Sequence, residues 1–193
     1  MSGSDPYVYP NSKVLRNKRN FVDATELDYV ERELVVQRIA EGAPTGRFDL
    51  DHLRAIHKHL FQDIYDWAGE LRRVELAKDG NQFQFRRFIE TGMADVHGRL
   101  ERSHYLKSLT AMEFAAKAGE IIGDVNYVHP FREGNGRTQL EYLRLLAQQA
   151  GHPVDLSKID AARWLAASKA AHRGNYEPFS DEILAILILR QAE

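Results

Sequence analysis

Residues 110–150 read TAMEFAAKAGEIIGDVNYVHPFREGNGRTQLEYLRLLAQQA, and this stretch decides the fold of the chain. Thr110 and Glu113 have the T-x-x-E spacing of a capping box, which predicts that a helix begins here. Apolar residues then recur at helical spacing on both sides of a break at residues 129–136. A second helix is predicted over residues 137–150, and its apolar residues on several sides place it at the centre of the fold.

The break between these helices has the features of an anion site. Pro130 predicts that the first helix ends near Val128, because the residue before a proline avoids the helical conformation. Gly134 and Gly136 are expected to adopt backbone conformations that are closed to other residues. Free N–H groups at a helix start, with the positive end of the helix dipole behind them, suit a phosphate. Arg137, in the first turn, adds a guanidinium that holds a phosphate through two hydrogen bonds.

Two side chains of the same loop add chemistry. Glu133 supplies a carboxylate, and the Mg²⁺ that accompanies nucleotide phosphates prefers oxygen ligands and takes few of them from the protein. His129 is the nearby group whose ordinary pKa suits proton transfer at neutral pH. Phe131 is predicted to anchor the loop in the core. The loop therefore predicts phosphoryl or nucleotidyl transfer.

The rest of the chain is predicted to be mainly helical. Further helices are expected over residues 24–41, after Asp49, and over 88–103, 161–172 and 180–191, although the apolar run of the last segment alone is also compatible with a strand. Residues 72–85 instead alternate in polarity on both sides of Asp79-Gly80, which predicts a β-hairpin that lies against the helices. The fold class is therefore all-α with one small hairpin.

Composition excludes several classes of protein. The chain has 193 residues, no cysteine and a formal net charge of −2. It therefore has no disulfide, thiolate zinc site or cysteine nucleophile, and no overall positive field that would attract nucleic acid. The longest apolar run, residues 183–189, is far shorter than the about 20 residues of a membrane span. We expect a cytoplasmic protein without a nucleic-acid or membrane partner.

The other histidines and the two tryptophans are expected to be structural. His57 and His59 are two residues apart, so on a helix they face different directions and do not share a metal ion. We expect the same of His172, and we expect Trp67 and Trp164 to be core or rim aromatics.

The loop resembles the signature of the Fic family. Residues 129–137, HPFREGNGR, match H-x-F-x-[D/E]-G-N-G-R without a mismatch, and residues 7–17, 52–72 and the hairpin are also similar to Fic proteins. The arrangement is most similar to bacterial Fic toxins and to the Fic domains of Bartonella-type secreted effectors. The resemblance implies a single Fic domain over residues 1–193, a helical bundle around a central helix-loop-helix. Its active-site loop would be 129–137, and its hairpin flap about 72–85.

The resemblance also implies an activity and a set of site residues. Fic proteins are adenylyltransferases that move AMP from ATP, with Mg²⁺, to a hydroxyl side chain of a target protein. His129 resembles the general base and Glu133 resembles the Mg²⁺ ligand. The expected nucleotide-binding residues are those of the anion nest, the following arginine and the flap: Gly134, Asn135, Gly136, Arg137, Lys78 and Asp79.

Two departures concern nucleotide affinity and regulation. The family's last arginine falls at Leu140, so we expect weaker transfer, unless Arg144, one turn later, substitutes. The family's inhibitory pattern [S/T]-x-x-x-E-[G/N] does not occur in the sequence, which favours control by a separate small antitoxin-like protein.

The resemblance leaves alternatives open. A toxin would act in the bacterial cytoplasm and a secreted effector in the host cytoplasm. The alternative functions are a Doc-like phosphotransferase or other nucleotidyl transfer, and a Fic-shaped binding module with impaired catalysis.

Overall fold

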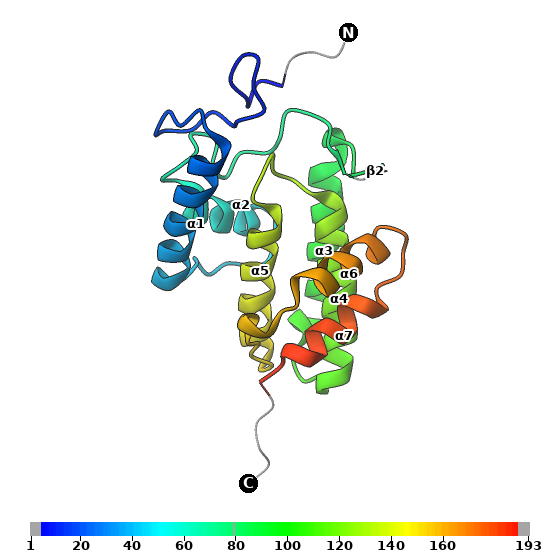
Figure 1. Cartoon of the computed structure of the whole chain (residues 1–193). Helices are drawn as coiled ribbons and strands as arrows, with labels where there is room; N and C mark the ends of the chain where they lie inside the picture. The colour runs from blue at the N-terminus through cyan, green and yellow to red at the C-terminus, as the bar shows by residue number, and fades with distance from the viewer. Residues whose placement is uncertain (1–4, 79, 189–193) are drawn as a thin grey trace.

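The computed structural model describes residues 5–78 and 80–188, which form seven α-helices, three short 3₁₀ turns and one hairpin (Figure 1). The α-helices are α1 (Ala24–Glu41), α2 (Leu50–Phe61), α3 (Ile89–Arg102), α4 (Ala111–Val128), α5 (Asn135–Ala150), α6 (Ala161–Ala171) and α7 (Glu177–Ile186). The strands are β1 (Ala77–Lys78) and β2 (Asn81–Gln82), and the 3₁₀ turns are Arg86–Phe88, His104–Leu106 and Leu156–Lys158. The prediction of an all-α fold with one hairpin is confirmed.

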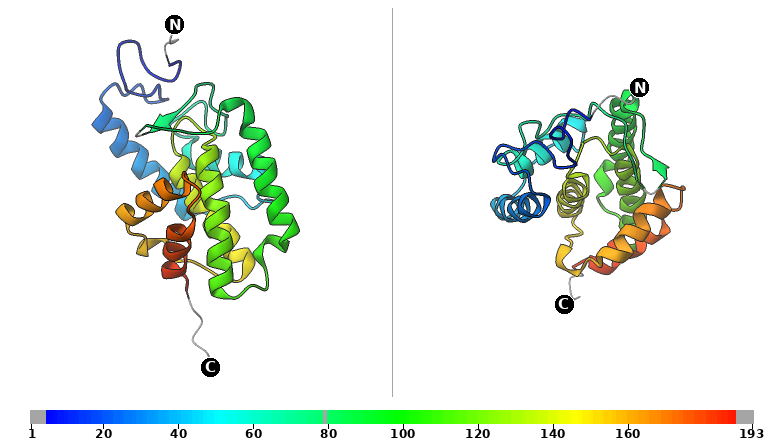
Figure 2. Two further views of the ribbon diagram at one scale, coloured as in Figure 1. Left: turned by 90° about the vertical axis from the view of Figure 1, so that its right-hand side faces the viewer. Right: turned by 45° about the horizontal axis from the view of Figure 1, so that its top comes forward.

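Helix α5 lies in the middle of the molecule. Figures 1 and 2 show α1 and α2 on one side of it and α3, α4, α6 and α7 on the other. Its buried side chains include Tyr142, Leu143 and Leu146, which are shielded from solvent completely. A helix that is apolar on several sides is stable only where other helices cover it. The central position predicted for this helix is therefore confirmed.

Several helix ends follow directly from local sequence. The Asp23 carboxylate accepts hydrogen bonds from the first amides of α1, and Gly42 ends that helix with φ +87°. Both hydrogen bonds of the capping box form at the start of α4: the Thr110 side chain accepts from the amide of Glu113, and the Glu113 side chain accepts from the amide of Thr110. Helix α4 ends at Val128, as Pro130 predicts.

Two helices differ from their predicted limits. Helix α5 begins at Asn135, because Gly136 adopts an ordinary helical conformation and belongs to the first turn. Helix α7 begins at Glu177, with Pro178 in the first turn, where a missing N–H costs nothing. It ends at Ile186 because Leu187 pairs with Val154 in an isolated β-bridge. Residues 189–191, which were also predicted to be helical, lie outside the described residues.

The hairpin is shorter than its alternating pattern suggests. Ala77 pairs with Gln82 and Lys78 with Asn81, so each strand has two residues. The flanking segments bond to the body instead: the amide of Gln84 donates to the carbonyl of Tyr127 at 3.0 Å. An isolated hairpin of this size is not stable in water, so these contacts hold it over the end of α4.

The segment before α1 also lies against the site loop. The Asp5 carboxylate accepts a hydrogen bond from Nε of Arg132 at 2.9 Å. The ring of Tyr7 packs edge-on against Trp67, 5.4 Å between centroids, and its hydroxyl accepts from the amide of Arg73. Among residues 5–78 and 80–188, no helix has the length and apolarity that would let it cross a membrane.

Candidate active site

His129 directly follows α4 and has a left-handed backbone conformation, φ 47° and ψ 61°. This conformation turns the chain out of the helix, and the His129 amide still donates to the carbonyl of Val125. Nδ1 of the ring lies 3.1 Å from the carbonyl oxygen of Asn126. Because a carbonyl accepts only, Nδ1 carries the proton, and Nε2 is left as the acceptor nitrogen.

The surroundings of the ring keep His129 neutral. Phe83, from the segment after β2, stacks on it with 3.7 Å between centroids and 13° between planes. Burial lowers the pKa of His129 to about 4, and the positive charges of Arg72 and Lys78 act in the same direction. At neutral pH the imidazole is therefore the unprotonated form that accepts a proton.

The loop after His129 is held by buried contacts. Phe131 is fully buried and stacks on His57 of α2 at 3.9 Å. The Asn135 side chain accepts from the amide of Phe131 at 3.0 Å and donates to its carbonyl at 2.8 Å. His57 accepts from the amide of Gly69 at Nδ1, so Nε2 donates to the carbonyl of Glu133. The core role predicted for Phe131 and the structural role predicted for His57 are confirmed.

The two glycines at the start of α5 have different roles. Gly134 has φ +79°, and a Cβ there would lie 2.4 Å from Cζ of Phe61, so another residue would strain both backbone and packing. Gly136 has no positive φ, and a Cβ there would meet nothing within 4 Å. The predicted need for unusual backbone geometry is therefore right for Gly134 and wrong for Gly136.

Arg137 is held on three sides. One guanidinium nitrogen lies 2.5 Å from Glu31 of α1 and another 3.7 Å from Glu133, and the group lies 4.7 Å above the Phe61 ring. Glu31 is buried and also accepts a hydrogen bond from the hydroxyl of Tyr65. Glu31 could not be predicted from the sequence, because an acidic residue in a polar helix gives no sign of a partner on a distant helix.

His129 and residues 132–137 border one cavity of about 570 Å³. The residues assigned to the site from the sequence that line it are Lys78, His129, Glu133, Gly134, Asn135, Gly136 and Arg137, and Leu140, at the position of the family's last arginine, lines it as well. The structure thus brings together the predicted site residues that it describes. Asp79 lies outside the described residues.

Arg144 does not replace the family arginine that is absent at Leu140. Leu140 faces the cavity, whereas the guanidinium of Arg144 bonds to the carboxylate of Glu141 at 2.8 and 3.0 Å. Arg144 is not part of the cavity lining. The alternative in which Arg144 substitutes is therefore not supported, because its side chain bonds to a neighbour on its own helix; the expectation of weaker transfer stays a prediction.

Other lining residues were given no ligand role from sequence. Gln139 is 3% exposed, and its Nε2 has no hydrogen-bond partner within the described chain. Trp164 and His172 of the α6 region also line the cavity, although the sequence predicts only structural roles for them. A buried donor without a hydrogen-bond partner costs free energy, so the side chain of Gln139 is an unfavourable feature of the free chain.

The carboxylate of Glu133 is suited to a magnesium ion that is bound by the phosphates of a nucleotide as well as by the protein. Its side chain is 47% exposed and lies on the cavity wall, with one oxygen 2.9 Å from the amide of Gly134. Mg²⁺ typically takes one or two carboxylates and completes its shell with water and phosphate. The described residues contain no cluster of three metal-ligating side chains.

The comparison with protein families agrees with this geometry. The model of the Fic/DOC family matches residues 47–147. The chain belongs to the Fic/DOC family. The match contains α2, the hairpin, α4, the loop and nearly all of α5.

Curated relatives match over most of the chain. It is 39% identical over 180 residues to the "Probable protein adenylyltransferase y4lH" of Sinorhizobium fredii, covering 93% of this chain and 94% of that protein. It is 38% identical over 180 residues to the "Protein adenylyltransferase VbhT" of Bartonella schoenbuchensis, covering 92% of this chain but 38% of that longer protein. These relatives confirm the prediction of a protein adenylyltransferase.

Solved structures show the same fold. The Fic domain of a Bep effector from Bartonella quintana superposes with a TM-score of 0.85 at 30% identity, covering 94% of this chain and 91% of that one. BepC from Bartonella tribocorum, solved with bound AMPPNP, has a TM-score of 0.87 at 27% identity, covering 96% and 97%. The prediction of a Fic fold is confirmed.

Proposed function

We propose that the cavity binds ATP and that the protein transfers AMP to a serine, threonine or tyrosine hydroxyl of a target protein. One observation carries the proposal: a neutral imidazole with a free acceptor nitrogen shares a cavity with an open helix N-terminus. The first group removes a proton and the second binds an anion, and nucleotidyl transfer needs both. The structure of BepC contains AMPPNP, an ATP analogue, which supports ATP as the nucleotide that binds here.

The phosphates would bind at the first turn of α5. The backbone amides of residues 135–137 have no acceptor within the described chain and lie at the positive end of the helix dipole. Gly136 leaves the space in front of them open, since it has no side chain. Arg137, already held by Glu31 and Glu133, keeps further N–H donors for an outer phosphate.

The target hydroxyl would give its proton to Nε2 of His129. Its oxygen then forms a bond to the α-phosphorus, the bond from that phosphorus to the β-phosphate oxygen breaks, and pyrophosphate leaves. Phe83 and the carbonyl of Asn126 hold the ring in place during this transfer. Bound at Glu133, Mg²⁺ would neutralise charge on the phosphates.

The nucleoside would lie toward α6. Ile159, Trp164 and Leu165 give that end of the cavity apolar surface. An apolar slot with few polar groups suits a purine base.

The target would bind along the hairpin, whose Lys78 and Phe83 line the cavity. Its strands pair only with each other among the described strands, so an outer edge remains for an extended segment. The structure from Bartonella quintana is that of a translocated effector, which favours a secreted effector here; a bacterial toxin is the alternative. Because the family's inhibitory pattern does not occur in the sequence, we also propose a separate small inhibitory protein as a partner. The compartment would then be the bacterial or the host cytoplasm.

Mass spectrometry tests the proposal directly. The protein is incubated with cell lysate, ATP and Mg²⁺, and the tryptic peptides are searched for AMP and phosphate adducts. We expect AMP adducts on hydroxyl side chains, and their loss when EDTA is added. Phosphate adducts alone, at sites absent from a lysate without the protein, would establish phosphotransfer instead.

A further inference from the structure

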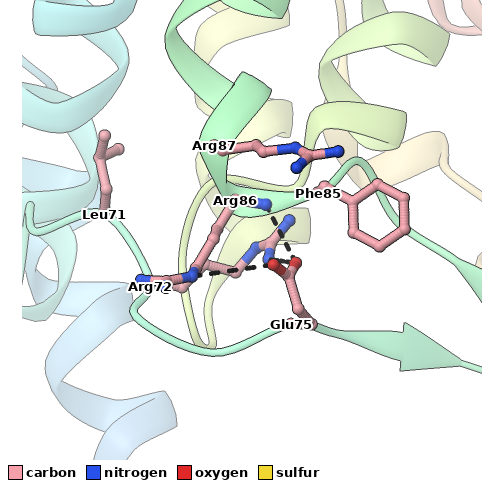
Figure 3. A pocket seen from close by; sticks show the side chains of 6 residues that line it. All are labelled: Leu71, Arg72, Glu75, Phe85, Arg86 and Arg87. Carbon is pink, nitrogen blue, oxygen red and sulfur yellow. Dashed lines mark hydrogen bonds and ion pairs between the residues drawn. The ribbon is translucent and has the colours of Figure 1, made fainter.

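A second hollow lies on the outer flank of the hairpin. It has a volume of about 640 Å³ and is lined by Leu71, Arg72, Glu75, Phe85, Arg86 and Arg87 (Figure 3). We call it the flank groove. These residues come from the two segments that enter and leave the hairpin, so the groove is separate from the catalytic cavity but belongs to the same flap.

Positive charge exceeds negative charge in the flank groove. Three arginines line it and one glutamate does, although the whole chain has a net charge of −2. Glu75 lies 3.3 Å from the buried Arg72 and 3.8 Å from Arg86, and Figure 3 shows its carboxylate between these two arginines. Within the described chain, Arg87 has no carboxylate partner.

Two exposed aromatic rings hold the unpaired arginine in place. The Arg87 guanidinium lies 4.7 Å from the ring centre of Phe88 and 5.8 Å from that of Phe85. Phe85 is 50% exposed and Phe88 is 43% exposed. Aromatic and arginine side chains that remain exposed together are typical of sites that contribute most to a protein interface.

We propose that the flank groove docks an acidic segment of the target protein, with an apolar side chain against Phe85. The proposal rests on the proposed function, because it assigns the groove to the protein that receives AMP. A target segment paired with the hairpin advances about 3.3 Å per residue, so residues a few positions away reach the groove. Charge complementarity selects carboxylates, and Phe85 and Phe88 favour a polypeptide.

The groove is also connected to the catalytic histidine. Nε of Arg72 donates to the carbonyl of His129 at 2.8 Å, while Nη1 of the same guanidinium faces Glu75 in the groove. The Arg72 side chain is itself buried, so a docked segment would contact Glu75, which pairs with the arginine that holds the carbonyl of His129. This arrangement makes the groove a suitable place to select targets before transfer.

Fluorescence anisotropy with a defined probe tests the docking site. The probe is a short fluorescein-labelled peptide in which aspartates flank one leucine, and the matched peptide has lysines in place of the aspartates. We expect the wild-type protein to bind the acidic peptide and not the basic one. Arg87→Glu should weaken this binding about tenfold, because it replaces attraction by repulsion without breaking an ion pair of the fold.

Arg102→Glu is the matched control, since Arg102 is an exposed arginine at the opposite end of α3 from Arg87. It should leave peptide binding unchanged, and both variants should keep wild-type affinity for ATP. Three results would each overturn the proposal. They are equal binding of the two peptides, equal effects of the two substitutions on binding, and tighter binding of single-stranded DNA than of the acidic peptide. Because peptide binding does not depend on AMP transfer, failure of the transfer assay would be a separate result.

Discussion

Gly134 and Gly136 are two residues apart, yet the structure requires only one of them for folding. Gly134 combines a φ of +79° with the close approach of Phe61, whereas Gly136 is helical and meets open space. We therefore expect Gly134→Ala to lower the free energy of unfolding by about 1–3 kcal/mol. Gly136→Ala should raise it by up to about 1 kcal/mol, since alanine favours a helix.

The more stable of the two variants, Gly136→Ala, should nevertheless bind ATP less tightly than the wild type. A methyl group at residue 136 would lie in the space proposed for the phosphates, so Gly136→Ala should weaken ATP binding at least tenfold in a more stable protein. Urea unfolding and calorimetric titration with ATP measure the two effects. A Gly136→Ala variant with wild-type ATP affinity would show that the phosphates bind elsewhere.

His129 should remain neutral well below the ordinary pKa of a histidine. Its pKa is lowered to about 4 by burial, and a base acts in its unprotonated form, which predominates above the pKa. At pH 6 about 99% of the side chain would then be neutral, against about a quarter at the ordinary value. NMR titration of the ring protons, assigned with His129→Ala, should show no transition between pH 5.5 and 8. A midpoint near 6.5 would mean that solvent reaches the ring.

At the scale of the elements, Arg72 joins the hairpin to the end of α4. Its fully buried guanidinium donates to the carbonyls of His129 and Val74 at 2.8 Å, and to that of Gln84. Arg72→Lys keeps the charge but loses the planar fork. We expect the free energy of unfolding to fall by about 2–3 kcal/mol, and the amide of Gln84 to exchange hydrogen faster.

Arg73→Lys is the neighbouring control, because that side chain is 71% exposed and pairs with Glu70 at the surface. It should change stability by less than about 0.5 kcal/mol. If both substitutions had the same effect on the Gln84 amide, Arg72 would not be the anchor of the hairpin.

Elements with local signals could be predicted from the sequence. Asp23 and Gly42 define α1, and Thr110 with Glu113 starts α4, because capping depends on residues within one turn. The apolar run after Ile183 was less informative, since burial continues past the helix into the bridge of Leu187 with Val154. A run that is buried in both conformations does not show where the helix ends.

The loop of residues 129–137 could be singled out from the sequence, but the residues that hold it in place could not. His129, Glu133 and Arg137 fall in one short motif, whereas Arg72 and Glu31 reach them only through the folded chain. Their contacts depend on how helices pack, which no local pattern in a single sequence records.

At the scale of the whole molecule, the site needs segments on both sides of residues 47–147. Asp5 binds Arg132, Glu31 of α1 binds Arg137, and α6 supplies one wall of the cavity. The site therefore includes residues outside the segment 47–147 that contains the motif.

A double-mutant cycle measures the coupling between α1 and α5. We expect Glu31→Gln and Arg137→Gln to show a coupling free energy of about 1–3 kcal/mol in urea unfolding, because Glu31 is buried. The exposed pair Asp28 and Arg32 should give less than about 0.5 kcal/mol. Additive effects at Glu31 and Arg137 would mean that α1 does not support the site.

Labelled ATP shows whether His129 and the start of α5 transfer AMP. The protein and its His129→Ala variant are each incubated with cell lysate and with ATP labelled at either the α- or the γ-phosphate. We predict label from the α-phosphate on a discrete protein band with the wild type, no band with the variant, and no label from the γ-phosphate. Label from the γ-phosphate alone, or α-label that persists in His129→Ala, would contradict the account.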